Sequence, residues 1–320
     1  MTTCAILAVA SISLVLYYIF FWEPRKVRYK TYEFSFRALP RSFDGFTILH
    51  LTDLHFRRRD SAKKKVLRSL AEEPVDLCLI TGDFIESPDA IGICCEALTG
   101  LNAAHGVYGV LGNHDYYRYS YVDALRNRSI TDRPNQSEEL LRALSATGIK
   151  VLRNESVRVE RNGEWIYVIG IDDGVTHRAD MPLAVGSIPK EEETLWILLC
   201  HTPDILKGAR VAREFLLLAG HTHGGQVRIP LWGPVVNHSK LKDGFVSGSV
   251  RFGEGVVVVS SGVGVNGLFP FRWRCKPEVI RITLRRNEGR DARDKKKEPS
   301  RGLPASGCRA VGNGHEQQRD

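Results

Sequence analysis

Short continuous apolar runs along the middle of this 320-residue chain place the strongest constraint on its fold. Apolar runs of this length suit strands that are buried on both faces of a sheet. Between the runs, residues 61–73 and 137–147 carry apolar side chains at helical spacing, and the second segment ends before Gly148. This alternation predicts an α/β fold with covered sheets. The predicted strands are residues 46–52, 75–81, 106–112, 165–171, 195–200, 215–220, 255–262 and 278–284.

Polar side chains follow five of these predicted strands, at the point where each apolar run stops. Ligands of open α/β sheets gather beyond the carboxyl ends of the strands. We therefore expect carboxylates, an amide and imidazoles to meet in one crevice. The residues are Asp53 and His55 after the first predicted strand, Asp83 after the second, Asn113, His114 and Asp115 after the third, His201 after the fifth, and His221 and His223 after the sixth.

The two paired motifs have a spacing that suggests how their side chains converge. Residues i and i+2 of an extended segment point the same way, so Asp53 and His55 are expected to face one side. The same holds for His221 and His223, and neighbouring glycines allow sharp turns there. Taken singly, each motif is weak, because an isolated histidine near a strand is more often a core residue than a ligand. Taken together, the motif residues are enough to hold two metal ions.

The order of the motifs resembles the signature of the calcineurin-like metallophosphoesterase superfamily, which reads DxH, GDxx, GNHD or GNHE, a lone histidine and GHxH. The corresponding stretches are DLH, GDFI, GNHD, CH and GHTH, within residues 46–284. The resemblance implies a sandwich of two mixed β-sheets flanked by helices. It also implies a dinuclear-metal hydrolase of phosphoric esters, in which a metal-bridging hydroxide attacks phosphorus in line.

The resemblance further implies a role for each motif residue. Asp83 bridges both metals, His114 lies off the metals and faces the substrate phosphate, and Asp115 orients His114. Histidine, carboxylate and amide ligands suit manganese, iron or zinc, and the habit of the family favours manganese. The first metal is bound by Asp53, His55 and His223, and the second by Asn113, His201 and His221.

The N-terminal segment predicts an uncleaved membrane anchor. Residues 2–22 carry no charge and match the length of about 20 apolar residues that a spanning helix needs. Tyr17, Tyr18 and Trp22 lie near its far end, where amphipathic aromatic residues belong. A cleaved export signal with a secreted body is the alternative, although such signals begin with positive charge. The positive-inside rule places the following domain in the cytoplasm, because Arg25, Lys26, Arg28 and Lys30 follow the anchor.

Composition divides the remainder into a catalytic domain, residues 31–287, and a C-terminal tail, residues 288–320, after the anchor segment at residues 1–30. The tail is rich in charge, Gly, Ser and Pro, so it cannot offset its ordering entropy and is expected to be disordered. The seven cysteines are odd in number and irregularly spaced, which argues against a disulfide framework and for a reducing compartment. The sequence leaves the oligomeric state open.

The net charge of +8 is compatible with nucleic acid or with an anionic membrane surface. Much of that charge lies in the anchor segment and the tail rather than in a base-reading module, so no specific nucleic-acid partner is expected. The stretches GHTHGGQV, IGIDD and NGLFPFRWRCKPEV resemble a membrane-anchored bacterial branch of the superfamily, which includes the UDP-2,3-diacylglucosamine pyrophosphatase of lipid A synthesis.

This finer resemblance implies a lipid-linked nucleotide substrate, cut to UMP and 2,3-diacylglucosamine 1-phosphate. It also implies that the membrane is a bacterial inner membrane, which the anchor crosses once. Arg57, after the DLH motif, and Arg272, in an apolar loop, are expected to contact substrate phosphates. A general phosphodiesterase or phosphatase of the same fold is the first alternative. A non-catalytic, membrane-tethered scaffold is the second, but scaffolds usually lose ligands and this chain has lost none.

Overall fold

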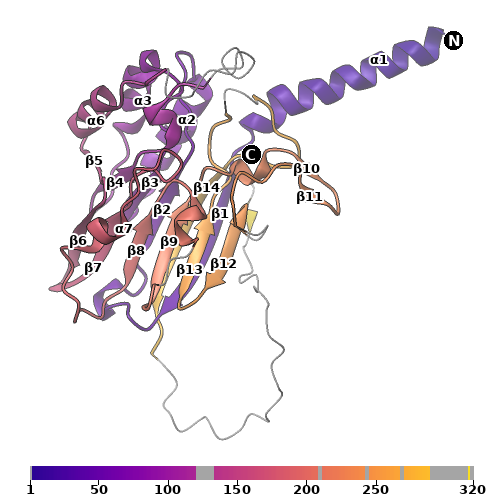
Figure 1. Cartoon of the computed structure of the whole chain (residues 1–320). Helices are drawn as coiled ribbons and strands as arrows, with labels where there is room; N and C mark the ends of the chain where they lie inside the picture. The colour runs from indigo at the N-terminus through magenta and orange to yellow at the C-terminus, as the bar shows by residue number, and fades with distance from the viewer. Residues whose placement is uncertain are drawn as a thin grey trace, which may run out of the picture.

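Two β-sheets packed face to face, with helices on the outside, form the body of the computed structural model (Figure 1). This arrangement confirms the predicted α/β sandwich. The structure describes residues 2–119, 133–207, 211–241, 245–266, 270–288 and 316–317.

The first sheet has seven strands in the order β15-β1-β14-β2-β3-β4-β5. Strands β2 to β5 run parallel, whereas β14 is antiparallel to β2 and parallel to β1. Helices α2 (Ser61–Ala71), α3 (Ile91–Leu98) and α6 (Ser137–Ala146) cover the outer face. The strands are β1 (Arg28–Phe36), β2 (Thr47–Leu51), β3 (Leu77–Thr81), β4 (Val107–Val110), β5 (Ile149–Val151), β14 (Glu278–Arg286) and β15 (Glu316–Gln317).

The second sheet has six strands in the order β12-β13-β9-β8-β7-β6. Its four central strands are parallel, and the edge strands β6 and β12 are antiparallel to their neighbours. The short helix α7 (Met181–Val185) packs on the outer face. The strands are β6 (Glu155–Arg161), β7 (Glu164–Gly170), β8 (Trp196–Leu199), β9 (Phe215–Ala219), β12 (Gly248–Phe252) and β13 (Gly255–Val259).

The main core lies between the two sheets and explains the continuous apolar runs. In β9, Leu216 and Leu218 face this inner core, whereas Leu217 packs into the layer outside the second sheet. A strand covered on both faces needs apolar side chains at every position. The strands that the runs did not reveal, among them β1 and β6, are partly exposed and alternate with polar residues.

The N-terminal helix α1 (Thr2–Tyr17) projects from the body (Figure 1). It continues through a π-helical turn, η1 (Tyr18–Trp22), and a 3₁₀ turn, η2 (Glu23–Arg25). Together these form one helical stretch, Thr3–Arg25, that is long and apolar enough to cross a membrane. Most of the predicted tail, residues 288–320, lies outside the described residues, and the short strand β15 within it pairs with β1.

Candidate metal centre

The five polar motifs all lie directly after parallel strands whose carboxyl ends meet at one edge of the sandwich. Strands β2, β3 and β4 deliver residues from the first sheet, and β8 and β9 deliver residues from the second. The third motif opens the short helix α4 (Asn113–Tyr116). This placement agrees with the rule that predicted a common crevice.

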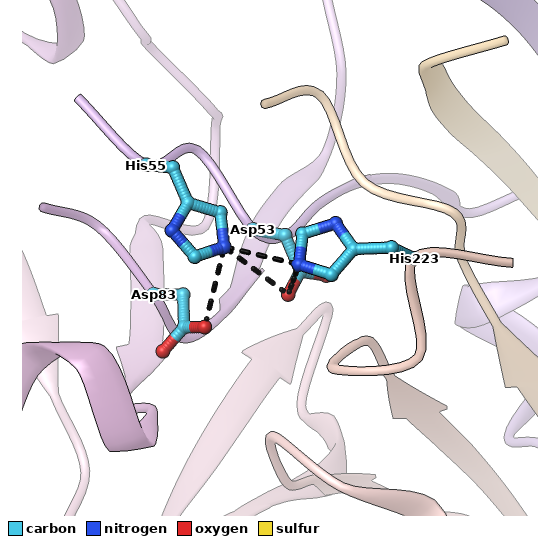
Figure 2. A group of neighbouring side chains, drawn as sticks. All are labelled: Asp53, His55, Asp83 and His223. Carbon is cyan, nitrogen blue, oxygen red and sulfur yellow. Dashed lines mark hydrogen bonds and ion pairs between the residues drawn. The ribbon is translucent and has the colours of Figure 1, made fainter. Parts of the chain in front are cut away.

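Four buried side chains, Asp53, His55, Asp83 and His223, point toward one another (Figure 2). Their ligand atoms all lie within 4.8 Å of one another. The Nε2 atom of His55 is 3.1 Å from Nε2 of His223 and 3.4 Å from Oδ2 of Asp83. The Nε2 atom of His223 is 3.5 Å from Oδ1 of Asp53. The structure thus brings together the three predicted ligands of the first metal and the predicted bridging carboxylate.

Asp83 also faces the residues expected at the second metal. Its Oδ2 atom lies 3.3 Å from Nε2 of His201, and that nitrogen lies 3.2 Å from Nδ1 of His221. The backbone N–H of His114 donates to Oδ1 of Asp83 at 2.9 Å. The side-chain oxygen of Asn113 is buried without a hydrogen-bond partner, which suits a group that can bind a cation. Asp83 therefore lies between the two halves of the site.

The protonation of the histidine rings tests whether these residues fit a cation. The Nδ1 atom of His55 is 2.6 Å from Oε1 of Glu86, and Nδ1 of His201 is 2.8 Å from the carbonyl oxygen of Thr81. A ring nitrogen this close to an acceptor oxygen carries the proton, so in a neutral ring Nε2 holds a lone pair. Both lone pairs then face the same carboxylate oxygen, which is repulsive unless positive charge lies between them.

The pKa values of the buried groups report the same need for positive charge. Burial alone would lower the pKa of His201, but the adjacent carboxylate of Asp83 raises it to about 10. Burial would raise the pKa of Asp83, yet His201 and His114 hold it well below its usual range. The carboxylate of Asp83 therefore draws a proton onto the adjacent ring of His201, whereas burial and neighbouring rings hold the pKa values of His221 and His223 well below the ordinary value. Ligands about 2 Å from a shared cation lie at the separations seen here, so the residues fit metal binding.

Five of the predicted ligand residues have left-handed backbone conformations, although the i, i+2 spacing of two pairs among them suggested extended ones. The strain is of order 1–3 kcal/mol for each residue, and it persists only where the surroundings enforce it. The paired side chains still face one pocket, but local turns rather than strand pleating aim them. The φ angles are 49° at Asp53, 44° at His55, 55° at Asp83, 68° at His221 and 49° at His223.

Two glycines allow these loops to approach one another. A Cβ atom on Gly112 would lie 2.3 Å from Oδ1 of Asp83, and one on Gly220 would lie 2.3 Å from Oδ2 of Asp53. Contacts this short do not occur for real Cβ atoms, so any side chain at either position would displace a ligand carboxylate.

Glu86 is a site residue that the sequence reading missed. Its carboxylate contacts His55 and also lies 3.6 Å, through Oε2, from Nδ1 of His114. Asp115, which was expected to orient His114, accepts hydrogen bonds from the backbone N–H groups of Phe84 and Gly112, at 2.8 and 2.9 Å. The carboxylate of Asp115 therefore holds the loop after β3. The available signal was an acidic residue three positions after Asp83, just beyond the GDFI stretch.

The two predicted substrate-binding arginines lie in different surroundings. Arg57 is half-buried and reaches the carbonyl oxygen of Val265 at 3.3 Å. Arg272 is fully buried, and its guanidinium donates to the carbonyl oxygens of Ser261 and Cys275, at 2.7 and 3.2 Å. These contacts give Arg272 a structural role in the loops behind Asp53, in place of the phosphate contact expected from the sequence.

Comparisons with known proteins agree with this geometry. The family model described as calcineurin-like phosphoesterase matches residues 46–225, and a short model described as InaF-motif, TRP-interacting helix, matches residues 6–26. The metallophosphoesterase YkoQ of Bacillus subtilis is 31% identical over 72% of this chain and 81% of its own length. Phosphodiesterase YaeI of Escherichia coli is 27% identical over 83% of this chain and 92% of its own length. A transmembrane protein with metallophosphoesterase domain from Danio rerio is 28% identical over 79% of this chain and 56% of its own length.

Proposed function

The chain belongs to the calcineurin-like phosphoesterase family and is a hydrolase of phosphoric esters, and from this premise we propose that it cleaves a phosphodiester or pyrophosphate bond in an amphiphilic substrate. The observation that best supports a site for two metals is the position of Asp83. Its Oδ2 atom faces His55, a predicted ligand of the first metal, and His201, a predicted ligand of the second. The name of the Escherichia coli relative supports a diester rather than a monoester.

The chemistry that two divalent cations supply is neutralisation of the phosphoryl oxygens and a lowered pKa of the attacking water. Asp53, His55 and His223 would hold one cation, and Asn113, His201 and His221 the other, with Asp83 shared. The mixed donor set suits manganese, iron or zinc, of which we propose manganese.

We propose that His114 acts on the leaving oxygen. Its ring is buried, its Nδ1 atom faces Glu86, and its Nε2 atom lies 3.4 Å from the side-chain nitrogen of Asn266. Burial would lower the pKa of His114, but Asp83 and Glu86 raise it above the ordinary value. A protonated imidazole here can donate a proton as the ester bond breaks.

A pocket of about 380 Å³ between the end of the N-terminal helix and the DLH loop supports an amphiphilic substrate. Phe20 and Phe21 line it from the helix, and Val263 lines it from the opposite loop. Arg25 and Arg57 contribute positive charge to the same pocket. One residue of its wall adjoins the metal centre, because Gly264 donates its N–H to the carbonyl oxygen of Asp53 at 2.7 Å. The arginines of this lining suit a phosphate group, and its apolar side chains suit an adjacent hydrocarbon chain.

The substrate we propose is UDP-2,3-diacylglucosamine, which combines a pyrophosphate with two acyl chains and would yield UMP and 2,3-diacylglucosamine 1-phosphate. In this proposal the N-terminal helix spans a bacterial inner membrane once, and the catalytic domain lies in the cytoplasm. The enzyme would then meet its substrate at the membrane surface. The helix length and the name of the Danio rerio relative support the membrane attachment.

The test offers the purified, manganese-loaded full-length protein two substrates in parallel, bis(p-nitrophenyl) phosphate and UDP-2,3-diacylglucosamine. We expect p-nitrophenol from the first and UMP from the second, and neither product from Asp83→Asn protein that remains folded. Turnover of the aryl diester without release of UMP would refute the proposed lipid-nucleotide substrate and would still support the phosphodiesterase activity. No turnover of either substrate by protein with two bound metals would refute both.

A further inference from the structure

Exposed large apolar side chains are concentrated in one short segment of the catalytic domain. Among the described residues that follow the N-terminal helical stretch, six large apolar side chains are exposed, and all but Leu183 lie between positions 229 and 236. Leu231 and Trp232 are the extreme cases, with exposed fractions of 104% and 86%. A contiguous exposed apolar patch marks an interaction site. The five residues are Ile229, Leu231, Trp232, Val235 and Val236.

These residues form a hairpin, which we call the 229–236 hairpin, between the short strands β10 (Arg228–Ile229) and β11 (Gly233–Pro234). The N–H of Trp232 donates to the carbonyl oxygen of Ile229 at 3.2 Å, with Pro230 at the second turn position. Leu231 occupies the third position with φ of 68°. Turns of this kind favour Gly or Asn there. A leucine is therefore a strained choice that the turn itself does not require, which points to a function for its side chain.

The hairpin lies on the same side of the molecule as the N-terminal helix (Figure 1). Both elements are joined to one loop. Arg228 donates its N–H to the carbonyl oxygen of Trp273 at 3.0 Å, and Arg272 donates its N–H to the carbonyl oxygen of Ile19 at 3.1 Å. The rings of Phe20 and Phe271 are 5.2 Å apart. The same loop therefore joins the end of the N-terminal helix to the hairpin, so a membrane that contains the helix lies on the side of the molecule that carries the hairpin.

We propose that the 229–236 hairpin is a second membrane contact, which inserts Leu231 and Trp232 into the interface of the bilayer that the N-terminal helix crosses. The inference rests on the membrane attachment proposed above. Tryptophan and leucine at an exposed tip suit the boundary between headgroups and acyl chains. Exposed Arg25, Lys26 and Arg274 lie beside the same loop, and their charge suits anionic headgroups.

The hairpin also links the bilayer to the metal centre. It begins shortly after His223, and the chain that leaves it returns to His238, whose ring lies 6.2 Å from the ring of His221. One end of the hairpin thus follows the motif that supplies two metal ligands, and the other end leads back to a residue beside that motif. Insertion of the tip would hold this side of the metal centre against the membrane surface, where a lipid-linked phosphate is presented.

The test measures quenching of tryptophan fluorescence by brominated acyl chains, with the full-length protein reconstituted into vesicles that contain phosphatidylglycerol. We expect bromine to remove a component of the emission that is absent from Trp232→Phe protein. Trp165, in β7 of the second sheet, supplies the matched control. In Trp165→Phe protein, bromine should quench the emission of Trp232 to the same extent as in wild type. Trp22, at the end of the helix, reports membrane attachment independently through Trp22→Phe.

A double variant, Leu231→Asn with Trp232→Ser, separates contact from folding. Asparagine tolerates a positive φ, so the variant should unfold at the same temperature as wild type or higher. We expect it to turn over a soluble aryl diester as wild type does and to lose at least about half of its rate on a vesicle-borne substrate. Emission from Trp232 that is unchanged by bromine, while that of Trp22 is quenched, would overturn the hairpin contact and leave the membrane attachment intact. Unquenched emission from both residues would overturn the attachment as well.

Discussion

The carboxylate of Glu86 lies 2.6 Å from Nδ1 of His55, on the side of the ring opposite the metal-facing nitrogen. Burial would raise the pKa of Glu86, but His55 and His114 hold it below its usual range, so the group is anionic at neutral pH. Partners of this kind fix the tautomer of a ligand histidine, and their loss typically costs about 10–100-fold in metal affinity or activity. We predict that Glu86→Gln weakens metal binding by this factor, measured by competition with a chelator.

Glu96→Gln provides the control for this change. Glu96 is exposed and pairs with Lys64 on the outer helices, so its loss should leave metal affinity within about twofold, because exposed ion pairs contribute little. A Glu86→Gln protein with the metal affinity of wild type would show that His55 is oriented without Glu86.

His114 is expected to act on the leaving group, and the effect of its removal should depend on how good that group is. A general acid contributes about 10²–10⁴-fold when the leaving oxygen is basic. We predict that His114→Asn lowers kcat by this amount for an alkyl phosphodiester and by far less for a p-nitrophenyl ester. Metal content, measured by atomic emission, should stay at the wild-type value. Equal losses with both substrates would assign His114 to charge stabilisation instead of proton transfer.

Much of the fold and of the candidate metal centre could be predicted from the sequence. Both depend on local patterns, namely continuous apolar runs and the polar motifs that follow them, which can be recognised without knowledge of tertiary contacts. The runs that became β8 and β9 are apolar at every position, since both faces of the second sheet are covered. The predicted ligand residues come directly after such strands, so the topology of parallel strands brings them together.

What the sequence could not predict depends on contacts between distant segments. Arg272 was expected to contact phosphate, but its position is set by carbonyl groups of the loop around Ser261, which no spacing rule reveals. Glu86 resembles any loop glutamate until the rings of His55 and His114 are placed beside it. Asp53 has a left-handed conformation and lies so close to Gly220 and Gly262 that a Cβ atom on either would clash with it, and no spacing rule reveals such an approach.

Gly112 should be intolerant of even the smallest side chain. An added methyl group would lie 2.3 Å from Oδ1 of Asp83 and 2.6 Å from the backbone nitrogen of the same residue, so Asp83 would have to move. We predict that Gly112→Ala lowers metal affinity and kcat by more than about tenfold each, because small misplacements in a catalytic site are costly. Chelator competition and steady-state kinetics provide the measurements.

Gly92→Ala is the matched control, since Gly92 lies in helix α3 and a Cβ atom there would meet nothing within 4 Å. Alanine should stabilise that helix by roughly 0.5–1 kcal/mol and leave turnover unchanged. Retained metal binding in Gly112→Ala protein would mean that the β3 and β4 loops are further apart than in this structure.

His50 should make the fold sensitive to acid independently of the metal centre. It is fully buried in β2, where its Nε2 atom lies 2.8 Å from the hydroxyl of Thr81, and burial lowers its pKa to about 3. Between pH 6.5 and pH 3 the unfolded chain binds a proton on this ring that the folded chain does not. The stability contributed by neutral His50 is therefore complete above pH 6.5 and is lost as the pH falls, at about 1.4 kcal/mol per pH unit.

We predict that the difference in unfolding free energy between wild type and His50→Gln shifts by about 2 kcal/mol in favour of the variant from pH 7 to pH 5. Urea unfolding of the two proteins at each pH provides the measurement, and the carboxylates common to both proteins cancel in the difference. Glutamine can still bond to Thr81 but does not titrate, so only the ring proton contributes to the shift. A difference that is independent of pH would mean that the folded protein accepts a proton on His50, which the apolar strand around it should prevent.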